Sequence, residues 1–218
     1  MSAKIISVNV GLPRLAMWRG ATVSTGIFKK PVKERVMVRR LNLDGDRQSD
    51  LSVHGGVDKA VYAYPSEHYD FWREELPEME LPWGMFGENL TTVGLSEDAV
   101  YIGDRFRIGR AELTVTQPRM PCHKLGIKFQ RADIIKRFLA SGRTGFYFSV
   151  QSEGEIGAGD ELELIERSTH AVKVSDITRL YVKDKGDVET MRRAIQVEAL
   201  PEGWRDYFRE RIEKFSES

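Results

Sequence analysis

Short segments in which apolar and polar residues alternate, with glycine or proline between them, dominate residues 1–166. Ile6, Val8 and Val10 alternate with polar residues, and residues 146–150 repeat the pattern with apolar side chains at every second position. A period of two places successive side chains on opposite faces of a strand. Many short strands bounded by turn residues predict a mainly β structure that closes into a barrel.

Helical periodicity is limited in this part of the chain to residues 66–76 and 133–141. Ser66 is a suitable N-cap for the first segment, and Gly142 follows the second, as is common where a helix ends. Because strands and helices do not alternate regularly, a doubly wound α/β fold is disfavoured.

The pattern changes near residue 167 to one typical of short helices. Three residues that favour helix starts follow it: Ser175, Asp187 and Pro201. The apolar stripe of the third predicted helix contains Trp204 and Phe208, and it favours a small helical core over a coenzyme-binding face.

The expected fold class is therefore mainly β (α+β), with two domains. Residues 1–166 are expected to form a β-barrel with peripheral helices. Residues 167–218 are expected to form a small three-helix domain.

The charge and cysteine content limit the partners and the compartment. The 33 basic and 33 acidic residues cancel, so no global positive field argues for nucleic acid as a partner. The single cysteine excludes an intrachain disulfide and is typical of a reducing compartment, so we expect a cytoplasmic protein. We see no segment typical of a signal peptide and no run near the ~20 apolar residues of a membrane span. We therefore expect no membrane association.

The cysteine, Cys122, lies in an unusual segment, residues 117–124. Three cationic or potentially cationic residues accompany it: Arg119, His123 and Lys124. Pro118 and Pro121 fix φ and remove backbone donors, which disfavours a helix or a central strand and predicts a shaped loop. Nearby positive charge favours the thiolate, which is the nucleophilic and metal-binding form of cysteine. A lone cysteine is also commonly a small buried apolar residue, so the segment alone leaves both interpretations open.

Three loops with glycine or proline beside polar residues border predicted strands: residues 45–59, 86–90 and 117–124. The Gly55–Gly56 pair allows positive φ or a close approach to a ligand. If a barrel brings the loops together, one thiol is surrounded by cations and amides: His54, Lys59, Asn89, Gln117, Arg119, Cys122, His123 and Lys124. Such a set suits an anionic ligand and a metal bound through sulfur.

Other kinds of site are less well supported by the same residues. Structural zinc normally takes four cysteine or histidine ligands at recognisable spacing, and this chain has one cysteine and four histidines. The glycine pairs do not form a phosphate-binding motif. A nucleophilic thiol remains open, with His54 or His123 as base and Asn89 as orienting group, although the spacing does not single these residues out.

The ordered motifs of the chain resemble those of a known family. They are Gly45-Asp46, Val53-His54-Gly55-Gly56, Asp58-Lys59-Ala60-Val61, Tyr64-Pro65, Phe86-Gly87-Glu88-Asn89-Leu90, Tyr101-Ile102-Gly103-Asp104 and Gln117-Pro118-Arg119 followed by Pro121-Cys122 and Lys124-Leu125. This set resembles the MOSC domain, named for the C-terminal part of molybdenum cofactor sulfurase. The helical tail resembles the 3-alpha domain of the YiiM-like bacterial subgroup.

The resemblance implies a β-barrel that binds molybdenum cofactor, a metal held by the dithiolene of a phosphorylated pterin. Cys122 is then the metal ligand. The residues implied to bind the cofactor are His54, Gly55, Gly56, Lys59, Gly87, Asn89, Gln117, Arg119 and Lys124. The residues implied to take part in catalysis are Cys122, His54 and Asn89.

The resemblance also implies an activity: reduction of N-hydroxylated compounds such as 6-N-hydroxylaminopurine to the amines, which detoxifies base analogues. A separate flavoprotein is the implied electron donor, and His54 or His123 is a candidate proton donor. Three alternatives remain: a carrier of cofactor or sulfur without turnover, a metal-free thiol hydrolase, and a structural protein with a buried cysteine.

Overall fold

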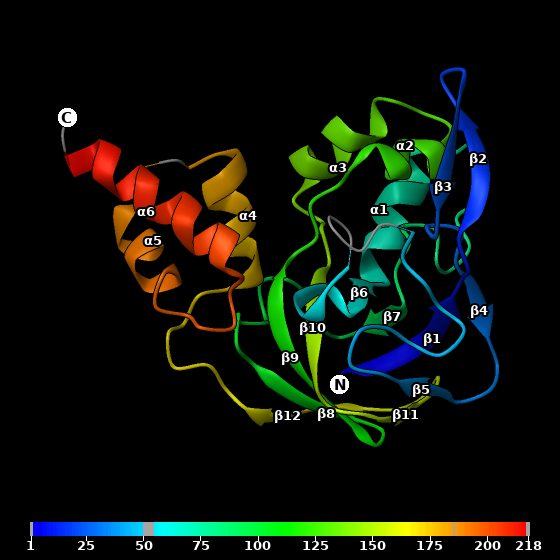
Figure 1. Ribbon diagram of the computed structural model, residues 1–218, viewed down its shortest axis with the longest axis horizontal. Coiled ribbons are helices and arrows are strands. Elements are labelled where there is room, and N and C mark those ends of the chain that lie inside the picture. The colour runs from blue at the N-terminus through cyan, green and yellow to red at the C-terminus, as the bar shows by residue number, and fades with distance from the viewer. Residues whose placement is uncertain (1, 50–54, 185, 217–218) are drawn as a thin grey trace.

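The computed structural model describes residues 2–49, 55–184 and 186–216. An eight-stranded sheet forms its centre (Figure 1). In spatial order the strands are β12 (Leu162–Glu166), β8 (Arg105–Ile108), β9 (Ala111–Pro118), β10 (Phe146–Ser152), β6 (Val61–Pro65), β7 (Leu90–Val93), β1 (Lys4–Val10) and β4 (Lys30–Val32). Neighbouring strands are antiparallel except β6 and β7, which are parallel.

Backbone hydrogen bonds close this sheet on itself. Ile5 N donates to Asp160 O at 2.9 Å, and Leu162 N donates to Ala3 O at 2.8 Å. These bonds join β1 to β12 and the turn before it, so the strands form a barrel. Two small antiparallel pairs complete the β structure: β2 (Arg14–Trp18) with β3 (Ala21–Thr25), and β5 (Val36–Val38) with β11 (Gly154–Ile156). The predicted mainly β fold class is confirmed.

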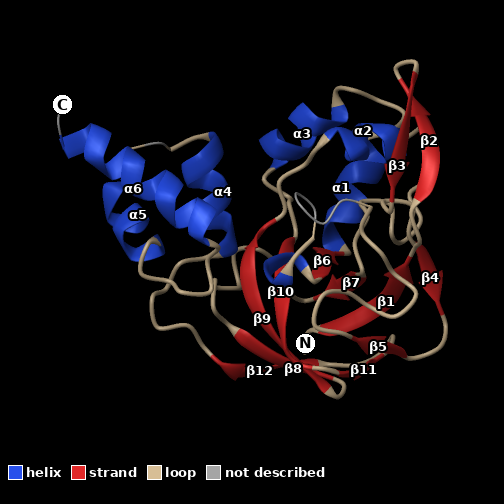
Figure 2. Ribbon diagram, viewed as in Figure 1, coloured by secondary structure: helices blue, strands red, loops and turns tan. Residues whose placement is uncertain are grey.

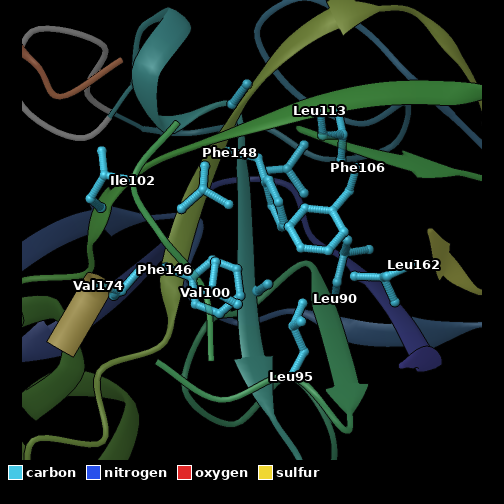
Figure 3. Packing of buried hydrophobic residues seen from close by; sticks show 14 of the residues in the cluster. Leu90, Leu95, Val100, Ile102, Phe106, Leu113, Phe146, Phe148, Leu162 and Val174 are labelled. Atoms are coloured by element: carbon cyan, nitrogen blue, oxygen red, sulfur yellow. The ribbon is translucent and has the colours of Figure 1, made fainter. Parts of the chain in front are cut away.

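Alternation along the strands fills the barrel interior. Leu113, Phe146 and Phe148 point inward and pack with Phe106 and Leu90 (Figure 3). All five side chains are buried. Burying an apolar side chain of this size contributes ~1.5–3 kcal/mol, so this cluster is the main source of barrel stability.

Three helices cover the barrel beside β6: α1 (Glu67–Glu75), α2 (His123–Phe129) and α3 (Ile134–Ser141) (Figure 1). They bury a second, largely aromatic cluster that contains Tyr64, Tyr69, Trp72, Phe86, Phe129 and Phe138. Two of these helices were predicted. Ser66 occupies the N-cap position of α1 but makes no capping hydrogen bond with its side chain, and Gly142 ends α3 with a φ of 69°.

Helix α2 was not predicted. Of the loop expected over residues 117–124, only residues 119–122 lie outside a strand or helix. Strand β9 continues through Gln117 and Pro118, and α2 begins at His123. Proline is tolerated at the end of β9 because pairing with β8 stops at Thr114, which leaves Pro118 at an edge. Pro121 lies before the N-cap and therefore does not interrupt α2.

The C-terminal segment forms α4 (Val174–Val182), α5 (Val188–Ala194) and α6 (Glu202–Ser216), which stand beside the barrel (Figure 2). Asp187 caps α5 as predicted, accepting a hydrogen bond from Thr190 N at 3.0 Å. The cap predicted at Ser175 is wrong, because α4 begins after Lys173. The boundary expected after residue 166 falls in the connection between β12 and α4 and stays a prediction. Within the residues described, no helix has the length and apolar character needed to cross a membrane.

Candidate functional site

Cys122 lies in the connection between the end of β9 and the start of α2. Its backbone is extended, with φ −127° and ψ 178°, and it forms the N-cap of α2. The side chain is half-buried and not in a disulfide. Strand β9 pairs with β10, and α2 begins at His123. The short connection at residues 119–122 is therefore fixed at both ends.

A cavity of about 630 Å³, measured to its open mouth, surrounds Cys122. Its walls come from the loop after β3, residues 47–49, η1 (Val57–Lys59), the turn before β7 and the end of β9. Five cationic side chains line it: Lys29, Arg47, Lys59, Arg119 and Lys124. No acidic residue lines it among the described parts of the chain. This charge favours an anionic ligand.

Arg119 is the most constrained of these cations. Only 6% of it is exposed, and its backbone N donates to Gly145 O at 3.2 Å. Its guanidinium carbon lies 5.4 Å from the Tyr62 ring centre and 5.1 Å from that of Phe138. One terminal nitrogen, Nη1, is buried without a hydrogen-bond partner among the described residues. An unpaired buried donor on a charged group is costly, which favours a ligand atom as its partner.

Two tyrosines, Tyr62 and Tyr147, face the same cavity, with ring centres 5.1 Å apart. Burial raises the pKa of Tyr147 above its ordinary value, while the charge of Arg119 lowers it. Burial likewise raises the pKa of Tyr62, whose hydroxyl donates to Thr144 O at 2.8 Å. Both phenols therefore stay protonated at neutral pH, and Tyr147 is available as a proton donor.

A buried ion pair supports the cavity wall. Lys29 Nζ lies 2.5 Å from both carboxylate oxygens of Asp46. Burial lowers the pKa of Lys29, and the charge of Asp46 opposes that shift. Asn89 Nδ2 donates to Asp46 Oδ2 at 2.9 Å, and Asn89 Oδ1 accepts from Tyr62 N at 3.1 Å. The Asn89 amide thus holds Asp46 and β6 in place, an arrangement that suits a supporting group more than a reacting one.

The cavity brings together six of the residues proposed from the sequence: Lys59, Gly87, Asn89, Arg119, Cys122 and Lys124. Lys124 Nζ also donates to Ser49 Oγ at 3.0 Å. His123 is exposed and does not line this cavity. His54 lies outside the described residues.

Gly55, Gly56 and Gln117 line a second cavity instead, which we call the interdomain groove. It measures about 900 Å³ to its open mouth. The groove lies between the barrel and the C-terminal helices, whose Tyr181, Trp204 and Tyr207 form its far wall. It shares Lys59 and Met120 with the Cys122 cavity, so the two cavities adjoin.

Sequence reasoning missed Lys29, Tyr62 and Tyr147. For Tyr147 a signal existed, because alternation in β10 places it on the opposite face from Phe146 and Phe148. Lys29 had no local signal, because its partner Asp46 is distant in sequence.

Among the described residues, no group of three or more histidine, cysteine, aspartate or glutamate side chains is placed to hold a metal. A metal at Cys122 would therefore need ligands from outside those residues.

Comparison with known proteins agrees with this architecture. The MOSC domain model matches residues 50–163, and the YiiM-like 3-alpha helix domain model matches residues 174–215. The Bacillus subtilis protein YflK is 43% identical over 94% of this chain and 92% of its own length. The crystal structure of YiiM from Geobacillus stearothermophilus superposes with a TM-score of 0.81 at 36% identity, covering 96% of this chain and 99% of that one.

A Gibberella moniliformis protein named a reductase is 35% identical over 74% of this chain, a match that spans 29% of the fungal protein. The two domain models together cover most of the chain, and each matches the part in which the structure has the corresponding barrel or helices. The chain therefore belongs to the MOSC domain family, in the YiiM-like group that carries a C-terminal 3-alpha helix domain.

Proposed function

We propose that the chain binds molybdenum cofactor in the Cys122 cavity and reduces N-hydroxylated compounds to amines with electrons from a separate flavoprotein. The observation that carries the proposal is Nη1 of Arg119, a buried donor with no partner among the described residues, on a side chain that lines the same cavity as the only cysteine of the sequence. The cavity offers a fixed cation for an anion and a thiol for a soft metal.

The cavity residues fit the cofactor's chemistry. The cofactor brings a phosphate and a dithiolene, both anionic, and the lining supplies Arg119, Lys59 and Lys124. Cys122 would add one sulfur ligand to a metal that arrives with its other sulfurs. That explains how a site can be built without a protein cluster of metal ligands. Gly87 has a φ of 80°, so its backbone takes a conformation that glycine adopts readily and larger residues avoid.

The proposed reaction converts R–NH–OH, two electrons and two protons into R–NH₂ and water. When bound, the cofactor supplies the two electrons for cleavage of the N–O bond. Cys122 would hold the metal, and Arg119, Lys59 and Lys124 would hold the anionic groups of the cofactor. The proton donor that we propose is Tyr147, which lines the cavity and whose pKa is raised by burial.

The name of one relative supports a reductase. The Gibberella moniliformis protein is named a reductase, and it is 35% identical over 74% of this chain, a match that spans 29% of the fungal protein. His54, Gly55, Gly56 and Gln117 are kept as proposed cofactor or substrate contacts, and Asn89 as a proposed supporting residue.

Metal analysis of protein made in a host that synthesises the cofactor tests the proposal. We expect about one molybdenum per chain, and loss of at least ~90% of it in Cys122→Ser, because a tenfold loss corresponds to ~1.4 kcal/mol of binding. Wild-type protein without molybdenum under these conditions would contradict the proposal.

Turnover separates an enzyme from a carrier. Loaded protein supplied with a strong chemical reductant should convert 6-N-hydroxylaminopurine to adenine. Stoichiometric molybdenum without conversion would favour the carrier. Conversion that persists after removal of molybdenum would favour metal-free thiol chemistry.

A further inference from the structure

The interdomain groove has features of a recognition site, and neither family model assigns it a ligand. Its far wall consists of three aromatic residues from the C-terminal helices: Tyr181 on α4, and Trp204 and Tyr207 on α6. Tyr181 is 42% exposed, and Trp204 and Tyr207 are only partly buried. Large aromatic side chains gathered at an open groove are unusual on a surface without a binding role.

The rings are arranged as a corner. Tyr181 and Trp204 have ring centres 5.4 Å apart and planes at 82°, and Trp204 and Tyr207 have planes at 88°. Aromatic pairs prefer either offset stacking or edge-to-face contact. A flat ring that enters this corner can stack on one wall and meet the edge of another, which makes both favourable contacts at once.

Hydrogen bonds fix the position of Trp204. Its indole Nε1 donates to Gln117 Oε1 at 3.0 Å, and Gln117 Nε2 donates to Asp58 O at 3.3 Å. This chain of bonds spans the groove floor from α6 to η1. The indole is therefore preorganised, which reduces the entropic cost of binding.

The opposite wall is backbone and polar groups. Gly56 has φ 96° and ψ 171°, a conformation essentially restricted to glycine, and a Cβ built there would meet no atom of the described residues within 4 Å. The backbone conformation therefore favours glycine beside the groove. Asp58 and Lys59 follow it, and they supply an acceptor and a donor for the edge of a heterocycle.

From these features we infer that the interdomain groove binds the planar heteroaromatic ring of the substrate. The inference rests on the proposed function and assigns recognition of the substrate ring to the groove and not to the Cys122 cavity. Because Lys59 and Met120 border both cavities, a ring held in the groove can extend its N–OH substituent across Met120 toward Cys122. Methionine suits this boundary because its flexible thioether adapts to different ligands.

Binding of adenine to the cofactor-free protein tests the groove independently of any turnover. Calorimetry should detect binding to the wild type. Trp204→Leu should weaken it by at least about tenfold, since stacking of a base on one aromatic side chain is worth roughly that factor or more. Trp204→Phe keeps a ring but loses the bond to Gln117 and should weaken binding less. Phe215→Leu, on the same helix but outside the groove lining, should leave it unchanged.

Because Trp204 also packs on Phe208, its loss could unfold α6, so Tyr181→Leu serves as a milder second variant. Circular dichroism checks that each variant is folded. Wild-type protein that fails to bind adenine, or folded Trp204→Leu and Tyr181→Leu variants that both bind normally, would overturn the inference. Loss of adenine binding when cofactor is loaded would also overturn it, because the pterin would then occupy the groove.

Kinetics with loaded enzyme complete the test. Trp204→Leu should lower kcat/KM for 6-N-hydroxylaminopurine at least about tenfold relative to kcat/KM for N-methylhydroxylamine, which has no ring. An equal loss for both substrates would contradict a ring-binding role. If adenine binds in a Trp204-dependent way but no N-hydroxylated substrate is reduced, the groove assignment stands and the proposed reductase activity fails.

Discussion

Glu88 and Arg119 are both buried charged side chains, but the protein surrounds them differently. Glu88 is fully buried and accepts hydrogen bonds from Gly84 N at 2.8 Å, Phe86 N at 3.1 Å, Thr91 Oγ1 at 3.0 Å and the Tyr69 hydroxyl. Arg119 is only 6% exposed, yet its Nη1 has no partner among the described residues.

The difference separates a structural charge from one held for a ligand. The carboxylate of Glu88 organises the turn before β7 and leaves little capacity for anything else. Arg119 lines the Cys122 cavity and keeps a buried donor without a partner among the described residues, which leaves capacity for a ligand atom. Burial alone therefore does not identify a functional charge; the completeness of its hydrogen bonding does.

The largest effect is expected from removing the structural charge. Glu88→Ala leaves four donors without their acceptor and should lower the free energy of unfolding by ~3–5 kcal/mol. Urea denaturation measures this. Glu80→Ala, at an exposed position, should change stability by less than ~0.5 kcal/mol. A small effect of Glu88→Ala would contradict the structural role that distinguishes Glu88 from Arg119.

Lys29 is an intermediate case, a paired charge that also lines the cavity. Lys29→Met removes one partner of the buried pair and should cost ~2–3 kcal/mol, less than usual because Gly11 N and Asn89 Nδ2 still donate to Asp46. Adding Asp46→Asn should recover part of that loss, because it removes the unpaired charge. A double-mutant cycle in urea measures the coupling, and a purely additive result would show that the pair contributes nothing.

Arg119→Met should separate ligand binding from stability. Without a ligand it removes an incompletely bonded buried charge, so the free energy of unfolding of the cofactor-free chain should change by less than ~1 kcal/mol or increase. Molybdenum content should still fall at least ~10-fold, which corresponds to ~1.4 kcal/mol. Arg73→Met, which removes an exposed cation over the Tyr69 and Trp83 rings, should leave the metal content unchanged. An Arg119→Met protein whose free energy of unfolding falls by several kcal/mol (~3 or more) but whose molybdenum content is unchanged would reverse the assignment.

The smallest effect concerns Lys128, whose ammonium lies 5.2 Å from the centre of the Phe28 ring. Burial lowers its pKa to about 8 from the ordinary 10.5. Between these values the unfolded chain binds more protons, so this group makes the free energy of unfolding rise with pH from about 8 to 10, by ~1 kcal/mol after allowance for solvent screening. Lys128→Met should flatten this rise, whereas Lys136→Met, at an exposed position, should not. The melting temperatures of the wild type and both variants, measured between about pH 8 and 10, test this prediction.

Much of the fold could be predicted from local patterns. Alternation identified β1 and β10, and in β10 the apolar side chains are the buried ones. Helix α2 was missed because Pro118 and Pro121 suggested a continuous loop, whereas one proline ends a strand and the other precedes the helix cap. Closure of the barrel between β1 and β12 depends on contacts between the two ends of the domain, which no local pattern shows.

The site was predictable where cysteine, charge and motif coincide, as at Cys122, Arg119 and Lys59. It was not predictable where the role depends on a distant partner. Trp204 was assigned to a helical core from its spacing, and packing on Phe208 supports that, but its indole also reaches Gln117 on β9. Periodicity identifies a buried stripe, but it does not show which member of the stripe faces another domain.

The bond from Trp204 to Gln117 joins residues that are 87 positions apart. Such a long-range contact forms late in folding and is among the first to open when a terminal helix detaches. Detachment of α6 would remove Trp204 and Tyr207 from the wall of the interdomain groove, while the barrel and the Cys122 cavity would stay intact. Moderate denaturant should therefore abolish ring recognition before metal binding, and hydrogen exchange in α6 should report the free energy of that opening.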